Sequence, residues 1–280
     1  MPLKDILVVI DDSPAMRPRL EAAVALARAF SAHLTVLCLV PEPFVPAMFG
    51  VHVPADLLAR QLAEAEQAAD GALAAALAIG RGQGITTAAL RETMPTDQLP
   101  VVLALHARRA DLTLLGPPDL DHNDLDTVLV AEAAFMDSGR PALLVPWSGK
   151  FELPPRRVVV AWDGSREAAR AANDALPFYA AAQQVSILVV DAPLPDVECR
   201  DARGTGIAAH LARHGVNAVV SRRTSEGRGV GETILAYVQD ERADLVVMGG
   251  YGHARLREVI LGGVTRHMLE HATLPILLAH

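Results

Sequence analysis

Four glycines near the C-terminal end of the chain are spaced in a way that could bind a phosphate group. Gly249 and Gly252 follow the apolar run 245–248, and Gly262 and Gly263 stand at the start of an amphipathic segment. Glycine lets a backbone approach a ligand closely, and the first turn of a helix presents unpaired N–H groups to an anion. We therefore interpret this segment as a candidate phosphate-binding site.

Two side chains within the segment could assist such a phosphate. Arg255 would act as a charged hydrogen-bond donor, and His253 as a donor when it carries a proton. Exposed loop residues of both types are also common where no ligand binds, so both interpretations stay open.

The sequence lacks the motifs that identify common hydrolases and phosphotransferases. It has no nucleophile elbow, no Walker lysine pattern and no His-Glu-x-x-His. Asp11 and Asp12 resemble the acidic pair of a phospho-receiver domain, but the third apolar run, 85–92, ends without the aspartate that such a domain phosphorylates. We therefore assign no catalytic residue and expect a binding protein rather than an enzyme.

Candidate metal ligands are present, but each set is incomplete. His267 and His271, like His210 and His214, have the i,i+4 spacing that places two rings on one helix face. Two ligands do not make a closed metal site. His267 and His271 lie on the same side as Val264 and Met268, so we expect this pair to border a packed face. The aspartates at 119–126 lack the glycine and glutamate of an EF-hand, and we interpret them as a solvated acidic loop.

The two halves of the chain repeat one order of elements. The run Ile6–Ser13 matches Val158–Ser165, since each is an apolar stretch that ends in an acid and a serine. Further along, Ala110–Gly116 matches Ala243–Gly249. Turn-forming residues and paired prolines interrupt the pattern between the halves. We therefore predict one domain over residues 1–147 and a second over residues 156–280.

Each half alternates strand-like and helix-like segments. The strand-like runs are continuously apolar, as expected when helices cover both faces of a sheet, and Ser13 and Ser165 are placed to cap the helix that follows. The predicted fold class is α/β, with two tandem doubly wound domains, each a five-stranded parallel sheet with helices on both faces. Ligands of such sheets bind beyond the carboxyl ends of the strands, where we expect Asp163 and the glycine segment.

Composition excludes several classes of partner. The 280 residues carry a net charge of −8, which argues against nucleic-acid binding. No apolar stretch reaches the ~18 residues that a membrane span needs, and the N-terminal residues lead straight into a strand without a signal peptide. Cys38 and Cys199 are too few for a disulfide framework. We expect a cytoplasmic protein that binds neither nucleic acid nor membrane.

These features together resemble the universal stress protein family, and the likeness covers both halves in order. Nucleotide-binding members carry a motif of glycine, two residues, glycine, nine residues, glycine, then serine or threonine. Gly249, Gly252 and Gly262 fit this spacing, whereas Gly263 stands where the motif has a hydroxyl. One neutral hydrogen bond lost there is worth about 1 kcal/mol, and the backbone N–H of Gly263 is retained.

The resemblance implies an adenine-nucleotide site in the second half. The ligand would be ATP, with or without Mg²⁺, bound under the glycine segment. Asp163 would lie near the nucleotide, and Val190 or Asp191 near the adenine. Thr265, two residues beyond Gly263, is expected to face a different direction from position 263.

The first half departs from this pattern. Gly116 is followed by two prolines and four aspartates within ten residues, which would repel a polyphosphate. The first half is therefore interpreted as the partner of an intramolecular pseudo-dimer. The implied function is a stress-response sensor or regulatory module that engages a protein partner and could dimerise further. The alternatives are a nucleotide-independent interaction protein and a slow ATPase.

Overall fold

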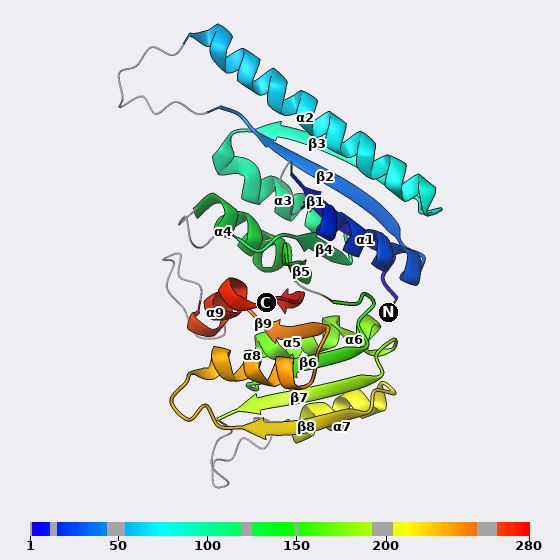
Figure 1. Ribbon diagram of the computed structural model, residues 1–280, viewed down its shortest axis with the longest axis vertical. Helices are drawn as coiled ribbons and strands as arrows, with labels where there is room; N and C mark the ends of the chain where they lie inside the picture. The colour runs from blue at the N-terminus through cyan, green and yellow to red at the C-terminus, as the bar shows by residue number, and fades with distance from the viewer. Residues whose placement is uncertain are drawn as a thin grey trace. The chain divides into compact units, whose positions relative to one another are not determined.

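The structure is a computed structural model that describes most of the chain. It covers residues 2–11, 16–43, 54–118, 125–148, 151–191, 204–250 and 262–280. The described residues form two compact units, one of Leu3–Ser138 and one that contains Gly139–His280 (Figure 1). In these parts of the chain, no helix is both long and apolar enough to cross a membrane.

The first unit is built on four parallel strands in the order β3-β2-β1-β4. The strands are β1 (Asp5–Ile10), β2 (His33–Pro41), β3 (Thr87–Met94) and β4 (Leu112–Leu115). The helices are α1 (Met16–Phe30), α2 (Ala55–Gly82), α3 (Leu99–Ala107) and α4 (Leu125–Glu132), with a 3₁₀ turn at Thr96–Gln98 and a π-helical turn at Ala133–Asp137. Strand β4 is buried at every position, as expected for a strand covered on both faces.

The second unit contains six strands in the order β5-β10-β9-β6-β7-β8. They are β5 (Ala142–Leu144), β6 (Arg157–Ala161), β7 (Gln184–Val190), β8 (Ala218–Arg223), β9 (Leu245–Gly249) and β10 (Ile276–Ala279). The helices are α5 (Arg166–Asp174), α6 (Leu176–Tyr179), α7 (Thr205–Arg213), α8 (Val230–Asp240) and α9 (Gly263–His271).

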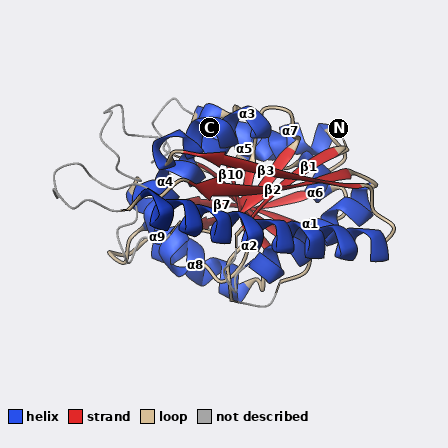
Figure 2. Ribbon diagram, turned by 90° about the horizontal axis from the view of Figure 1, so that it is seen from above, coloured by secondary structure: helices blue, strands red, loops and turns tan. Residues whose placement is uncertain are grey.

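Helices cover both faces of each sheet (Figure 2). In the first unit α1 and α2 pack against β1, β2 and β3, while α3 and α4 contact each other on the opposite face. In the second unit α5 packs on β9 and β10, and α8 contacts β7 and α9 on the other face. The prediction of two tandem, doubly wound α/β domains is confirmed.

The pairing of β5 was not predicted from the sequence. This strand, expected as the fifth parallel strand of the first half, pairs antiparallel with β10 in the second unit, with Leu143 opposite Leu277. All three residues of β5 are buried. A run of three apolar residues carries no sequence mark of its direction or its partner, so only tertiary structure decides both.

Candidate functional site

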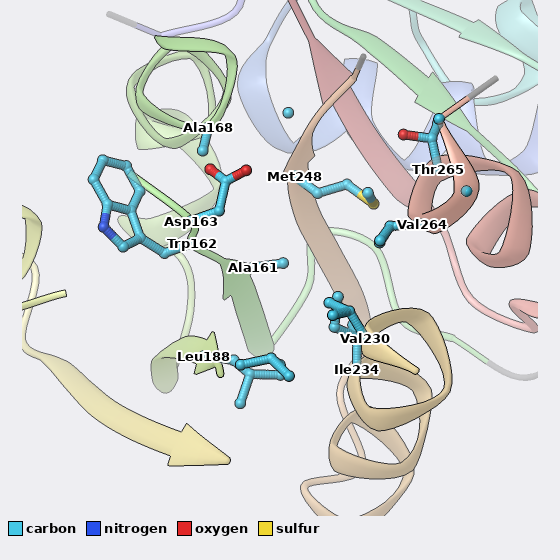
Figure 3. Close-up of a pocket in the computed structure, with 14 residues that line it drawn as sticks. Ala161, Trp162, Asp163, Ala168, Leu188, Val230, Ile234, Met248, Val264 and Thr265 are labelled. Carbon is cyan, nitrogen blue, oxygen red and sulfur yellow. The ribbon is translucent and has the colours of Figure 1, made fainter. Parts of the chain in front are cut away.

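A cavity of about 200 Å³ opens at the carboxyl ends of β6, β7 and β9 (Figure 3). This is where a doubly wound sheet binds its ligands. The lining residues come from three strands (β6, β7 and β9), three helices (α5, α8 and α9) and the residues beside them, which lie far apart in the sequence. They are Ala161, Trp162, Asp163, Ala168, Leu188, Val190, Val230, Ile234, Met248, Gly249, Gly262, Gly263, Val264 and Thr265. Five of the nine residues predicted from the sequence are therefore together at one cavity.

Asp163 lies in the turn between β6 and α5. Its Oδ1 accepts a hydrogen bond of 2.9 Å from the backbone N–H of Ser165, which fixes the carboxylate at the edge of the cavity. Ser165 caps α5 as predicted, because its hydroxyl accepts a bond of 3.1 Å from the backbone N–H of Ala168. The turn therefore holds one acceptor side chain toward the cavity and begins the helix that packs behind it.

Gly249 is a glycine for a packing reason. A Cβ at this position would lie 2.5 Å from the backbone nitrogen of Ala168 and 2.6 Å from the carbonyl carbon of Glu167. Both atoms belong to the backbone of α5, so neither can move aside as a flexible side chain would. Gly249 thus lets the start of α5 approach the end of β9, where both border the cavity.

Gly262 and Gly263 are different from Gly249. An added Cβ at either position would meet no atom of the described residues within 4 Å. Gly262 is the N-cap of α9 and Gly263 its first residue, so the unpaired N–H groups of the first turn lie beside the cavity. These two glycines leave open space where a ligand could approach the helix N-terminus.

Thr265 was expected to face a different direction from position 263, and the structure places it at the cavity as well. Thr265 is buried, lines the same cavity as Gly263, and lies across it from Asp163 with its hydroxyl oxygen turned inward (Figure 3). A two-residue step along a helix does change the side-chain direction, but the end of α9 points at the cavity, so successive residues reach its rim from different sides. Thr265 therefore brings a hydroxyl to the same cavity that Gly263 lines.

The apolar wall of the cavity was not predicted. Val230 and Ile234, one turn apart on α8, lie near Leu188 of β7 on one side of the cavity, and Met248 of β9 lies between Asp163 and Thr265 in this view (Figure 3). In the sequence, the spacing of Val230 and Ile234 is the same as that of any buried helix stripe. The cavity thus has an apolar end, and a polar end formed by Asp163 and Thr265.

Asp191 does not line the cavity. It follows β7 with a φ of +52°, and its Oδ1 accepts a bond of 2.8 Å from the backbone N–H of Ser225. The hydrogen bonds from Ser225 hold the pKa of Asp191 below its usual range. Asp191 therefore fixes the loop after β8 to the end of β7, next to Val190, which does line the cavity.

Replacing Asp191 with asparagine should destabilise the protein near neutral pH but not in acid. Because the folded-state pKa is lowered, the ionised carboxylate stabilises the fold above the unfolded pKa of about 3.9, and this contribution is lost as the pH falls through the folded-state value. Asparagine tolerates positive φ, so the backbone is retained. Urea unfolding of both proteins at several pH values should give a difference in stability that shrinks below about pH 4. A constant difference would contradict this role.

Three predicted residues lie outside the described residues. They are Gly252, His253 and Arg255, so their part in the site stays a prediction. Ser13, expected to cap the first helix, also lies outside them.

In the first unit, an arginine side chain occupies the corresponding ends of the strands. Arg19 of α1 is buried, and its Nη1 donates a bond of 2.7 Å to the carbonyl oxygen of Val9 and one of 3.2 Å to the Asp11 carboxylate. A Cβ on Gly116, the counterpart of Gly249, would lie 3.1 Å from Arg19 Nη2. The Arg19 guanidinium therefore fills the space beside Gly116, whereas Gly249, the counterpart of Gly116 in the second unit, borders a cavity.

Comparisons with known proteins identify the family. The model of the universal stress protein family matches residues 2–126 and 155–280. Over 46 residues, or 16% of this chain, the sequence is 37% identical to universal stress protein Slr1230 of Synechocystis and 35% identical to universal stress protein MJ0577 of Methanocaldococcus jannaschii. These matches span only 16% and 28% of the two relatives.

A solved structure shares the fold over the full length. A universal stress protein from Archaeoglobus fulgidus superposes with a TM-score of 0.71 at 17% identity, covering 98% of this chain and 97% of that one. The family match, which occurs once in each half, covers most of the sequence. The chain belongs to the universal stress protein family and contains two tandem copies of its domain.

Proposed function

We propose that the second domain binds an adenine nucleotide, ATP, in the cavity of Figure 3, and that the chain acts as a stress-response sensor or regulatory module rather than as an enzyme. The single observation that carries the proposal is the cavity itself. It brings Asp163, Val190 and Gly249 to one place with the open N-terminus of α9 at Gly262 and Gly263.

The two ends of the cavity suit the two ends of a nucleotide. The apolar end, between Leu188 and the Val230–Ile234 face of α8, suits a base that is bound by shape and apolar contact. Asp163 is an acceptor that suits a ribose hydroxyl. The first turn of α9 suits the phosphates, because its N–H groups and its dipole attract anions.

Thr265 is proposed to supply the hydroxyl that the motif lacks at Gly263. Its side chain faces the cavity from the first turn of α9. Mg²⁺ enters the proposal only as a counter-ion of the phosphates. Within the described residues, no three or more His, Cys, Asp or Glu side chains are grouped to hold a metal.

Binding of the nucleotide alone, without any reaction of it, would be enough to regulate the protein. A ligand that prefers one conformation of the second domain shifts the population toward it and so changes a surface that a partner recognises. The first domain, with Arg19 at the carboxyl ends of its strands, would bind no nucleotide and serve as the partner of the intramolecular pseudo-dimer. The same proposal includes three further points. The chain engages a protein partner, it could form a further homodimer, and it is located in the cytoplasm.

Isothermal titration calorimetry with ATP tests the proposal. We expect one site per chain, with affinity reduced by Thr265→Val, which removes the hydroxyl and keeps the shape of the side chain. Thr233→Val on α8 is the matched control, since Thr233 bonds to the Gly229 carbonyl and does not line the cavity. No heat at millimolar ATP would favour the nucleotide-independent interaction protein instead.

Restoring the hydroxyl at position 263 should strengthen binding. An added Cβ at position 263 meets no atom of the described residues within 4 Å, and the position lies in a helical turn, so the fold should accept Gly263→Ser. One added hydrogen bond of about 1 kcal/mol corresponds to roughly fivefold to tenfold tighter ATP binding. Gly263→Ala adds the Cβ without the hydroxyl, so it separates the effect of the added Cβ on ATP affinity from the effect of the hydroxyl. Equal affinities of the serine and alanine variants would contradict a phosphate at this position.

A further inference from the structure

Helix α3 of the first domain is almost entirely apolar. His106 is the one polar residue among the nine of Leu99–Ala107. The helix contacts α4 and the π-helical turn, and its residues Leu103, Ala104 and Ala107 are buried. A helix that is apolar on all sides is normally buried on all sides. An outer side of α3 that stays exposed is therefore unusual and calls for an explanation.

Two large apolar side chains stand on this outer side. Val101 is 62% exposed and Leu105 is 50% exposed. They are four residues apart, so they lie together on one face of the helix. Leu90 of β3 is exposed as well, and it points to the same face of the sheet as Glu92, whose carboxylate lies 3.0 Å from His106 Nε2 of α3. Exposed apolar side chains that are grouped in this way mark a surface for another protein.

The residues along the outer face of α3 are arranged symmetrically about position 103. They are Gln98, Val101, Leu105 and Arg108, at steps of three, four and three residues, which is the spacing of a seam that packs on another helix. The steps are the same when they are counted from either end. The face can therefore pack on that of a second copy that runs in the opposite direction, with Val101 next to Leu105 of the second copy.

The charges at the two ends of this face are opposite. Asp97, in the 3₁₀ turn before α3, and Arg108, directly after α3, are both exposed. Antiparallel packing brings Arg108 of one copy beside Asp97 of the other, and it does so twice, whereas parallel packing would bring like charges together. Arg108 also donates a bond of 3.2 Å to the carbonyl oxygen of Asp137. A guanidinium has five N–H donors, so it can bind a carboxylate as well.

We propose that two copies of this chain form a two-fold homodimer in which their α3 helices pack antiparallel through Val101 and Leu105. The inference gives a surface to the further homodimer of the proposed function, and it does not depend on nucleotide binding. A helix of nine residues is about 14 Å long, so the contact is smaller than the standard interface of about 1,200–2,000 Å². The dimer is therefore weak, with a Kd of about 1–100 µM.

Sedimentation velocity of the full chain without ATP, over about 1–500 µM, tests the proposal. We expect the monomer to convert to a dimer as the concentration rises. Leu105→Glu should weaken dimerisation by more than about 30-fold, because a charge replaces an apolar contact that occurs twice. The matched control is Leu57→Glu on α2. Leu57 is 47% exposed, close to the value for Leu105, and its substitution should leave the Kd unchanged.

Charge reversal tests the direction of the two helices. Asp97→Arg and Arg108→Asp, made singly, should each weaken dimerisation by about 3–30-fold, since each replaces two exposed ion pairs with two repulsive ones. The double variant restores both pairs with their charges exchanged, so its Kd should return to within about threefold of the wild-type value. Thermal unfolding in dilute solution shows whether each variant is folded.

Three results would each overturn the proposal. They are a monomer at every concentration, a dimer that Leu105→Glu does not weaken, and a double variant that binds no more tightly than the two single charge reversals. If Leu105→Glu does not fold, Val101→Lys provides the same comparison from the other apolar position. Because no nucleotide is present, none of these results depends on whether the chain binds ATP.

Discussion

Gly249→Ala should destabilise the second domain by about 1–3 kcal/mol, or more, because the new methyl group would overlap the backbone of α5. The atoms in its way are the nitrogen of Ala168 at 2.5 Å and the carbonyl carbon of Glu167 at 2.6 Å. Since α5 also packs on β10, it cannot withdraw without exposing buried surface on both strands. Thermal and urea unfolding should show a lower Tm and a lower midpoint for this domain.

The matched control is Gly263→Ala, in the same motif. Its methyl group meets nothing within 4 Å, and alanine is favoured over glycine in a helical turn by up to ~1 kcal/mol. Its stability should be unchanged or slightly higher. If both variants were equally stable, Gly249 would not be needed for packing, and its role would have to come from the ligand alone.

Asp11→Asn should destabilise the first domain by about 2–3 kcal/mol. The Arg19 guanidinium is buried, and without the carboxylate its charge lacks a counter-charge in a low-dielectric environment. Breaking a buried ion pair in this way typically costs 3–5 kcal/mol, and the half-exposed Asp11 reduces the figure because water can replace it. Chemical denaturation of the first domain measures the loss.

A double-mutant cycle with Arg19→Met separates the charge from the packing. Methionine retains much of the apolar bulk, so Asp11→Asn in that background should cost less than about 1 kcal/mol, and the coupling energy should exceed that value. Arg17 and Glu21 form an exposed i,i+4 pair on the same helix, and Glu21→Gln should change stability by less than ~0.5 kcal/mol. A cost for Asp11→Asn as small as that for Glu21→Gln would contradict the buried pair.

Much of the fold follows from the sequence because its signals are local and repeated. The buried strand that ends in Asp163, the cap at Ser165, and the glycines at 262–263 before an amphipathic segment each predict a strand end or a helix start. In a parallel sheet such ends meet at one edge. This geometry predicts that Asp163 and the glycine segment lie at one edge of the sheet, whereas the place of Val190 was predicted from the family resemblance.

The remaining features depend on contacts that a sequence does not reveal. Arg19 lies in an alanine-rich helix, where an arginine is expected on the solvent face, yet it turns inward to Asp11. Val230 and Ile234 read as an ordinary core stripe, although they border a cavity. The partner of β5 and the direction of Thr265 depend in the same way on how distant elements meet.

The proposal that the cavity of the second domain binds a nucleotide can be tested directly through one of the cavity's own side chains. Trp162 is buried and lines the cavity, whereas Trp147, the other tryptophan of the chain, is exposed. In Trp147→Phe, titration with ATP should therefore change the fluorescence of Trp162 in a saturable way, with one site per chain. Adding Ala161→Leu, which places a larger side chain in the cavity, should abolish the change while the Tm is retained. No change up to millimolar ATP, or the same saturable change with leucine in the cavity, would contradict nucleotide binding at this site.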